Sequence, residues 1–131
     1  FTSLDALREA ARNDLELGKN VTDCEALAWL GRYYGAKIRG ASALALFDLG
    51  GDKLEHDAAQ RHLADALAHW KRYAAIRDAH YVPALYNRVG HVNVTALTEK
   101  VAADLDIARE WKPGTLKDDG KRGGTERGFR Q

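Results

Sequence analysis

The chain has 131 residues, with 20 Lys or Arg against 19 Asp or Glu, which gives a formal net charge of +1. Its hydrophobic (45%) and charged (30%) fractions exclude a low-hydrophobicity disordered chain and are typical of a globular protein. Nucleic-acid-binding domains usually carry a clear basic excess, so the balanced charge argues against that partner. No apolar run approaches the roughly 18 residues that a membrane span needs.

The first predicted helix covers residues 4–17. Thr2 or Ser3 is placed to cap its N-terminus, and Gly18 stands where a helix commonly ends. Its apolar residues recur at helical spacing: Leu4, Leu7, Ala11 and Leu15.

A second, longer helix is predicted over residues 22–49. Thr22 and Glu25 have the spacing of a capping box, and Gly50-Gly51 ends the helical pattern. Apolar residues lie on more than one side of this helix, which is typical of a central helix with neighbours on both flanks. One apolar stripe comprises Leu27, Leu30, Tyr34, Ile38, Ala41 and Ala45, and the other sides carry Trp29, Tyr33, Leu44 and Phe47.

Two glycines interrupt the apolar pattern of this helix. Gly31 and Gly35 each cost a helix about 1 kcal/mol relative to alanine. We therefore expect another backbone to approach the helix closely at these positions.

The third helix is predicted over residues 53–80 and the fourth from Asn93 or Thr95 to about Trp111. The short turn between the second and third helices predicts an antiparallel hairpin. The intervening stretch is irregular, with residues 85–89 fitting a single helical turn. The inner sides are predicted to carry Ala59, Leu63, Ala66, Leu67, Trp70, Tyr73, Ala74 and Arg77 on the third helix, and Leu97, Val101, Leu105, Ala108 and Trp111 on the fourth.

These elements predict an all-α fold, an antiparallel bundle of about four helices with a long central hairpin and an extended C-terminal tail. Residues 1–112 form the predicted bundle domain. Residues 113–131 form the predicted tail, because this stretch has five glycines and no aliphatic side chain after Leu116. Since the chain opens at Phe1 without an initiator Met, we expect it to belong to a longer protein.

The sequence contains no motif that predicts catalysis. It has no Gly-x-Ser-x-Gly, no His-Glu-x-x-His and no phosphate-binding loop, and its single cysteine, Cys24, has no partner. Glu55, His62 and His69 are spaced seven residues apart on one predicted helix. Ligands two turns apart are separated by roughly 10 Å and cannot share one ion. We therefore predict no catalytic residue, no metal site and no cofactor.

The segment 80–91 is the candidate binding site. It concentrates aromatic rings, a forked donor and histidines in a loop beside a proline, which is a composition suited to stacking on sugars and binding their hydroxyl groups. An alternative is structural: Tyr81, Leu85 and Tyr86 close the end of the bundle while Arg88 satisfies helix-end carbonyls. The candidate binding residues are His80, Tyr81, Tyr86, Arg88 and His91.

Three stretches carry a family resemblance: LGRYYGAKIRGA at 30–41, ALAHWKRY at 66–73 and PALYNRVG at 83–90. Together they resemble helical regions at the C-terminal end of large bacterial secreted glycan-active proteins of the glycoside hydrolase kind. The resemblance implies a non-catalytic accessory module that packs on a companion catalytic domain of the same parent protein and contributes to a glycan cleft. It also implies a periplasmic or extracellular location.

A second resemblance supports an alternative function. Leu30, Gly31 and Tyr34, followed by Ala43 and Phe47, are similar in spacing to one tetratricopeptide repeat, although Glu55 stands where that repeat has a proline. This resemblance implies a stand-alone helical module that binds a protein or peptide.

Overall fold

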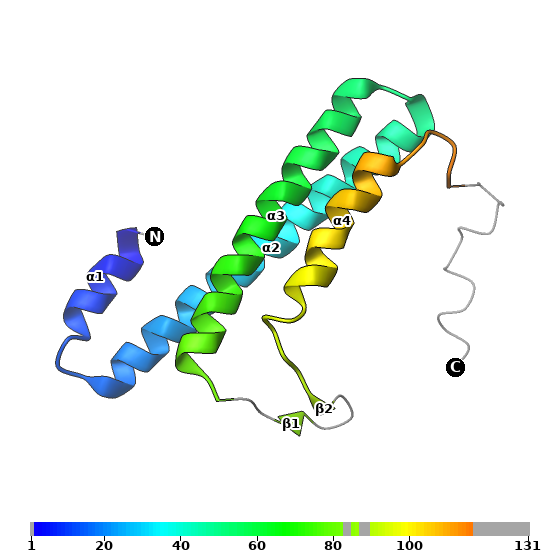
Figure 1. Cartoon of the computed structure of the whole chain (residues 1–131). Helices are drawn as coiled ribbons and strands as arrows, with labels where there is room; N and C mark the ends of the chain where they lie inside the picture. The colour runs from blue at the N-terminus through cyan, green and yellow to red at the C-terminus, as the bar shows by residue number, and fades with distance from the viewer. Residues whose placement is uncertain (1, 83–84, 87–89, 117–131) are drawn as a thin grey trace, which may run out of the picture.

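The computed structural model of the chain describes residues 2–82, 85–86 and 90–116. Within these ranges it contains four helices: α1 (Thr2–Ala10), α2 (Leu15–Gly50), α3 (Lys53–His80) and α4 (Thr98–Glu110). α2 and α3 form a long antiparallel hairpin, α4 packs on α3, and α1 folds back beside the start of α2 (Figure 1). The predicted all-α antiparallel bundle with a long central hairpin is confirmed.

The boundary between the first two helices differs from the prediction. α2 begins at Leu15 rather than at Thr22, so the predicted first helix is divided between α1 and α2. The Asp14 side chain caps α2 by accepting a hydrogen bond from the Leu17 N–H at 2.9 Å. Thr22 lies inside the helix, where its hydroxyl donates to the Gly18 carbonyl at 3.1 Å, so Gly18 ends no helix.

The turn between α2 and α3 follows the prediction closely. Gly51 has a φ of 68°, a left-handed conformation that favours glycine, and its N–H donates to the Phe47 carbonyl at 2.7 Å. The Asp52 side chain then caps α3 by accepting from the Leu54 N–H at 2.9 Å. One residue therefore ends α2 and the next begins α3, which fixes the two helices as antiparallel neighbours.

Small residues set the distance between α2 and α3. A Cβ atom added at Gly40 would lie 2.7 Å from Leu63 Cγ and 3.4 Å from the Ala59 carbonyl oxygen. The predicted close approach is therefore at Gly40 rather than at Gly31 and Gly35, and the prediction for these two glycines is wrong. The other small residues buried in the hairpin are Ala26, Ala36, Ala43, Ala59, Ala66 and Ala74.

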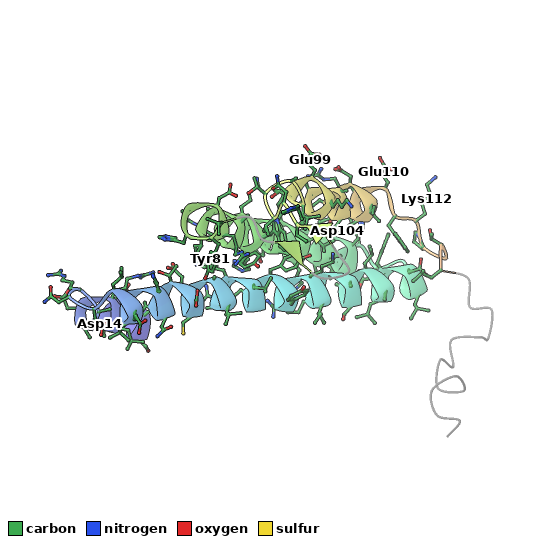
Figure 2. The ribbon with its side chains drawn as sticks, turned by 90° about the horizontal axis from the view of Figure 1, so that it is seen from below. Asp14, Tyr81, Glu99, Asp104, Glu110 and Lys112 are labelled. Atoms are coloured by element: carbon green, nitrogen blue, oxygen red, sulfur yellow. The ribbon has the colours of Figure 1, made fainter. Side chains whose placement is uncertain are left out.

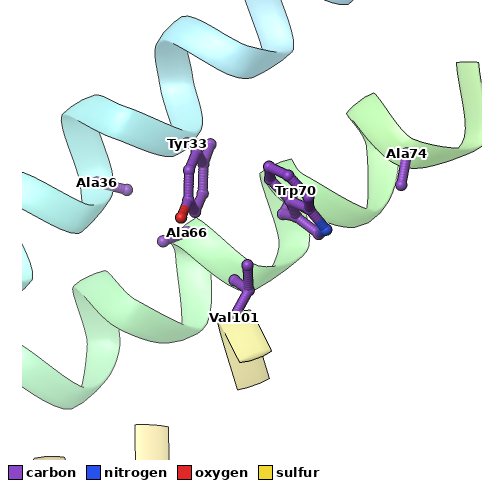
Figure 3. Packing of buried hydrophobic residues seen from close by; sticks show 6 residues of the cluster. All are labelled: Tyr33, Ala36, Ala66, Trp70, Ala74 and Val101. Carbon is purple, nitrogen blue, oxygen red and sulfur yellow. The ribbon is translucent and has the colours of Figure 1, made fainter. Parts of the chain in front are cut away.

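An aromatic cluster joins the hairpin to α4 (Figure 3). The Trp70 ring lies 5.0 Å from the ring of Tyr33 on α2 and 5.4 Å from that of Tyr73. Its indole N–H donates to the Thr98 hydroxyl at the start of α4 at 3.1 Å, and Val101 of α4 is buried in the same cluster. The indole N–H of Trp70 is therefore hydrogen-bonded although the ring is buried, and the same contacts fix the position of α4.

The prediction that α2 is the central helix with neighbours on both flanks is wrong, because α3 is the helix that packs against both α2 and α4. Tyr33, outside the stripe that contains Tyr34, is 5% exposed, whereas Tyr34 is 54% exposed. Leu27 and Ile38 of that stripe are each 65% exposed. The face that meets α3 carries Ala36, Gly40 and Ala43, which allow the two backbones to approach. Leu27 and Ile38 lie on the face that is turned away.

The predicted inner sides of α3 and α4 agree with the structure. The buried residues are Ala59, Leu63, Ala66, Trp70 and Ala74 on α3, and Val101 and Ala108 on α4. The connection between these helices differs from the predicted helical turn. β1 (Leu85–Tyr86) pairs with β2 (Gly90–His91) as a short antiparallel hairpin, while residues 87–89 lie outside the described part of the chain.

A buried carboxylate holds the start of the predicted tail. Asp48, near the end of α2, is 4% exposed. It accepts hydrogen bonds from the Trp111 indole at 2.7 Å, the Thr115 N–H at 2.9 Å and the Leu116 N–H at 3.2 Å. Charge-assisted bonds of this kind are stronger than neutral ones, so they tie the segment after α4 to the end of α2. Residues 117–131 lie outside the described part.

Replacing Gly40 with Ala is expected to lower the free energy of unfolding by about 1–3 kcal/mol, because the added methyl would overpack the hairpin against Leu63. The matched control, Gly31→Ala, should raise it by up to about 1 kcal/mol, because alanine favours the helix. The Cβ added at Gly31 meets no atom within 4 Å. Urea unfolding followed by circular dichroism measures both changes. Equal effects of the two substitutions would contradict the close approach at Gly40.

Candidate functional site

An open cleft of about 790 Å³ lies where the α1–α2 turn meets the C-terminal end of α3. Two of the predicted binding residues, His80 and Tyr81, line it from α3 (Tyr81 and Asp14 are labelled in Figure 2). The α1–α2 side contributes Ala11, Arg12, Asn13, Asp14, Leu15, Gly18, Lys19, Thr22 and Asp23. The cleft is therefore formed by segments that are far apart in the sequence.

Tyr81 is the most constrained side chain of the cleft. It ends α3 with its N–H bonded to the Arg77 carbonyl at 3.0 Å, and its hydroxyl donates to the Asp23 carboxylate on α2. The Arg77 guanidinium lies 4.0 Å from the centre of its ring. The hydrogen bond to Asp23, together with partial burial, raises the pKa of the Tyr81 phenol above its ordinary value, and Arg77 opposes this rise. Tyr81 therefore stays protonated and fastens the end of α3 to α2.

The lining of the cleft is mixed in character. Ala11, Leu15 and Gly18 contribute apolar surface, while Asn13 and His80 contribute hydrogen-bonding groups. Mixed linings of this kind suit a small ligand that has hydroxyl groups and an apolar face.

The remaining predicted binding residues are not placed in the cleft. Tyr86 lies on β1, where its backbone pairs with Gly90, and nothing is described of its side chain. Arg88 lies outside the described residues. His91 is exposed on β2 and does not line the cleft. The structure thus groups His80 and Tyr81 with the α1–α2 turn and separates them from His91.

Sequence reasoning missed the residues that the α1–α2 turn contributes to the cleft. Asp14 and Asp23 were not identified as candidate residues, because a helix was predicted across residues 4–17 and the turn was placed later in the chain. The available signal was Asp14 itself, since an aspartate is a preferred N-cap residue. Recognising this cap would have placed the start of α2 at Leu15 and the turn before it.

A second surface feature is the uncovered side of α2. We call it the outer face; its residues are all exposed and alternate four and three positions apart: Leu27, Gly31, Tyr34, Ile38 and Ala41. Figure 2 shows α3 and α4 together on the opposite side of α2. Contiguous exposed apolar residues of this kind usually mark an interaction surface.

Metal-ligating residues do not gather in the part of the chain that the structure describes. No group of three or more His, Cys, Asp and Glu side chains there is placed to hold an ion. His69, one of the three residues spaced along α3, instead has its ring 5.6 Å from that of Trp29. In the same ranges, none of the helices has the length and apolar character required to cross a membrane.

Comparisons with known proteins supply no relative for this chain. No protein-family model matches it, and neither a curated protein nor a solved structure matches it significantly. A function must therefore be inferred from the cleft and the outer face.

The Tyr81 phenol is expected to titrate above the ordinary tyrosine pKa of 10.0. Ultraviolet difference titration of the wild-type chain against Tyr81→Phe isolates this group. Because the Tyr81 pKa is higher in the folded chain than in the unfolded chain, the protonated phenol stabilises the fold. This contribution is fully present below the unfolded-state pKa of Tyr81 and is lost as pH rises through its folded-state pKa. Asp23→Ala should return the Tyr81 pKa toward its ordinary value. If Asp23→Ala leaves the Tyr81 pKa unchanged, Asp23 does not cause the rise in that pKa.

Proposed function

We propose that this chain is a non-catalytic helical accessory module that packs against a companion catalytic domain of a larger bacterial carbohydrate-active protein. The exposed outer face of α2 is the observation that carries this proposal. Leu27, Tyr34 and Ile38 are each more than half exposed. Full burial of one large apolar side chain contributes about 1.5–3 kcal/mol, so covering three of them provides a substantial driving force for docking.

The small residues of the outer face favour a close-packed partner. Gly31 and Ala41 alternate with the larger side chains, so the helix surface offers hollows as well as projections. The alternating four- and three-residue spacing is that of a seam along which a second helix can lie. We infer that the partner covers the face with a helix rather than with a loop.

The cleft supports the carbohydrate part of the proposal. The Tyr81 ring and the Asn13 amide that line it are groups of the kinds that commonly bind sugars. Its two carboxylates are already engaged within the chain, Asp14 with the Leu17 N–H and Asp23 with the Tyr81 hydroxyl. Glycoside hydrolysis requires a carboxylic acid and a carboxylate that are both directed at the substrate. The cleft therefore fits a binding role, and the catalytic groups belong to the companion domain.

The alternative is a stand-alone module that binds a protein or peptide. The same outer face favours it, because a seam of this spacing accepts a helix from any source. The two functions differ in whether the partner belongs to the same polypeptide or to a separate one. A companion in the same polypeptide covers the outer face permanently, whereas a separate partner covers it only when present.

The outer face should be reactive in the isolated chain and protected in the complete natural polypeptide. Ile38→Cys, made together with Cys24→Ser, provides one thiol on this face. Its reaction with a maleimide should slow by at least about tenfold in the complete polypeptide, because access would require undocking.

The matched control for this labelling is Ala75→Cys in the same Cys24→Ser background, since Ala75 is exposed on α3 and lies outside the outer face. Its labelling rate should be similar in both contexts. Rates that are unchanged at both positions would refute docking to a domain of the same polypeptide. They would favour the stand-alone module.

A further inference from the structure

A groove of about 540 Å³ lies between α2 and α3, apart from the cleft at Tyr81. Residues of α2 form most of it, and His69 of α3 completes it: the α2 residues are Ala28, Gly31, Arg32, Gly35 and Arg39. Every charged side chain that lines the groove is basic, and no carboxylate lines it. Gly31 belongs both to the groove and to the outer face, so the groove runs along one edge of that face.

The two glycines of the groove are not explained by packing within the described chain. Each costs α2 about 1 kcal/mol relative to alanine. Gly40 is explained, because α3 would meet a Cβ atom there, but a Cβ at Gly31 would meet nothing within 4 Å. At Gly35 the nearest atom is a side-chain atom, Arg39 Nη1, at 3.6 Å. Gly31 therefore leaves a bare helix surface that a group from outside can approach, and Gly35 leaves room for the Arg39 guanidinium.

The basic side chains are already arranged around this bare surface. Arg39 Nη1 lies over the Gly35 position, and none of the ion pairs within the described residues includes Arg39. The Arg32 guanidinium lies 5.2 Å from the centre of the Trp29 ring, and the His69 ring lies 5.6 Å from the same ring. Trp29 thus positions one basic group from each helix beside the groove.

We propose that this groove binds an oxyanion, a carboxylate, sulfate or phosphate group carried by a small ligand. Guanidinium groups bind such anions through paired N–H donors, and these charge-assisted bonds are stronger than neutral ones. Arg39 and Arg32 supply the donors, and His69 adds a further ring N–H. The bare surface at Gly31 lets the anion approach the helix without meeting a Cβ atom. This site does not depend on the proposed docking function.

Isothermal titration of the isolated chain with sodium phosphate, sodium sulfate and sodium glucuronate tests the site, with chloride keeping the ionic strength constant. At least one oxyanion should bind saturably at one site. Preference for glucuronate would identify a sugar carboxylate as the natural group, and preference for phosphate or sulfate would identify an inorganic-type anion. The absence of saturable binding for all three would overturn the proposal.

Substitutions distinguish anion binding in the groove from nonspecific attraction of anions to surface charge. Arg39→Gln should weaken binding of the preferred anion by at least about tenfold, because it removes a charged fork from the site. Gly35→Leu keeps every charge and fills the groove, and it should also weaken binding. Arg61→Gln, at an exposed α3 position outside the groove, is the matched control and should leave the affinity unchanged. Equal weakening by Arg39→Gln and Arg61→Gln would refute a specific site, and circular dichroism checks that each variant is folded.

Discussion

The close approach of α2 and α3 at Gly40 is the constraint on which the rest of the structure depends. With no side chain at this position, Leu63 and the Ala59 backbone occupy the space where a Cβ atom would be. This contact selects which side of the 36-residue α2 helix is buried. Because the side that carries Ala36, Gly40 and Ala43 faces α3, Leu27 and Ile38 remain on the surface. The outer face is therefore a direct consequence of how the hairpin packs.

Polar contacts at the two ends of the hairpin position the remaining segments. At the end where α3 stops, the Tyr81 hydroxyl donates to Asp23 and holds α3 against α2 beside the cleft. Near the α2–α3 turn, Asp48 binds the segment that follows α4. His56 also donates to the Ala108 carbonyl at 2.7 Å, which holds α4 at the same end. The α2–α3 hairpin thus forms the body of the fold, and polar contacts at its two ends hold the other segments in place.

The sequence predicted the positions of the helices better than it predicted which side of each helix is buried. Helical periodicity and the Gly50-Gly51 pair were sufficient to predict the α2–α3 hairpin, because these signals are local. They could not indicate whether Tyr33 or Tyr34 is buried, because α2 is apolar on several sides and the choice depends on which face fits α3. For the same reason the close approach was assigned to Gly31 rather than to Gly40. Of the residues that line the cleft, the sequence analysis named only His80 and Tyr81, as candidate binding residues. The rest come from a turn about 60 residues earlier, a separation that local periodicity cannot bridge.

Two adjacent tyrosines provide the most direct test of this packing. Tyr33 is 5% exposed and Tyr34 is 54% exposed, although they follow one another in the chain. Hydroxyl-radical footprinting of the isolated folded chain, with tandem mass spectrometry to separate the two residues, measures their relative accessibility. The account predicts that Tyr34 is modified much faster than Tyr33. Modification of Tyr33 at an equal or greater rate would mean that the other face of α2 meets α3, and it would remove the basis for the outer face.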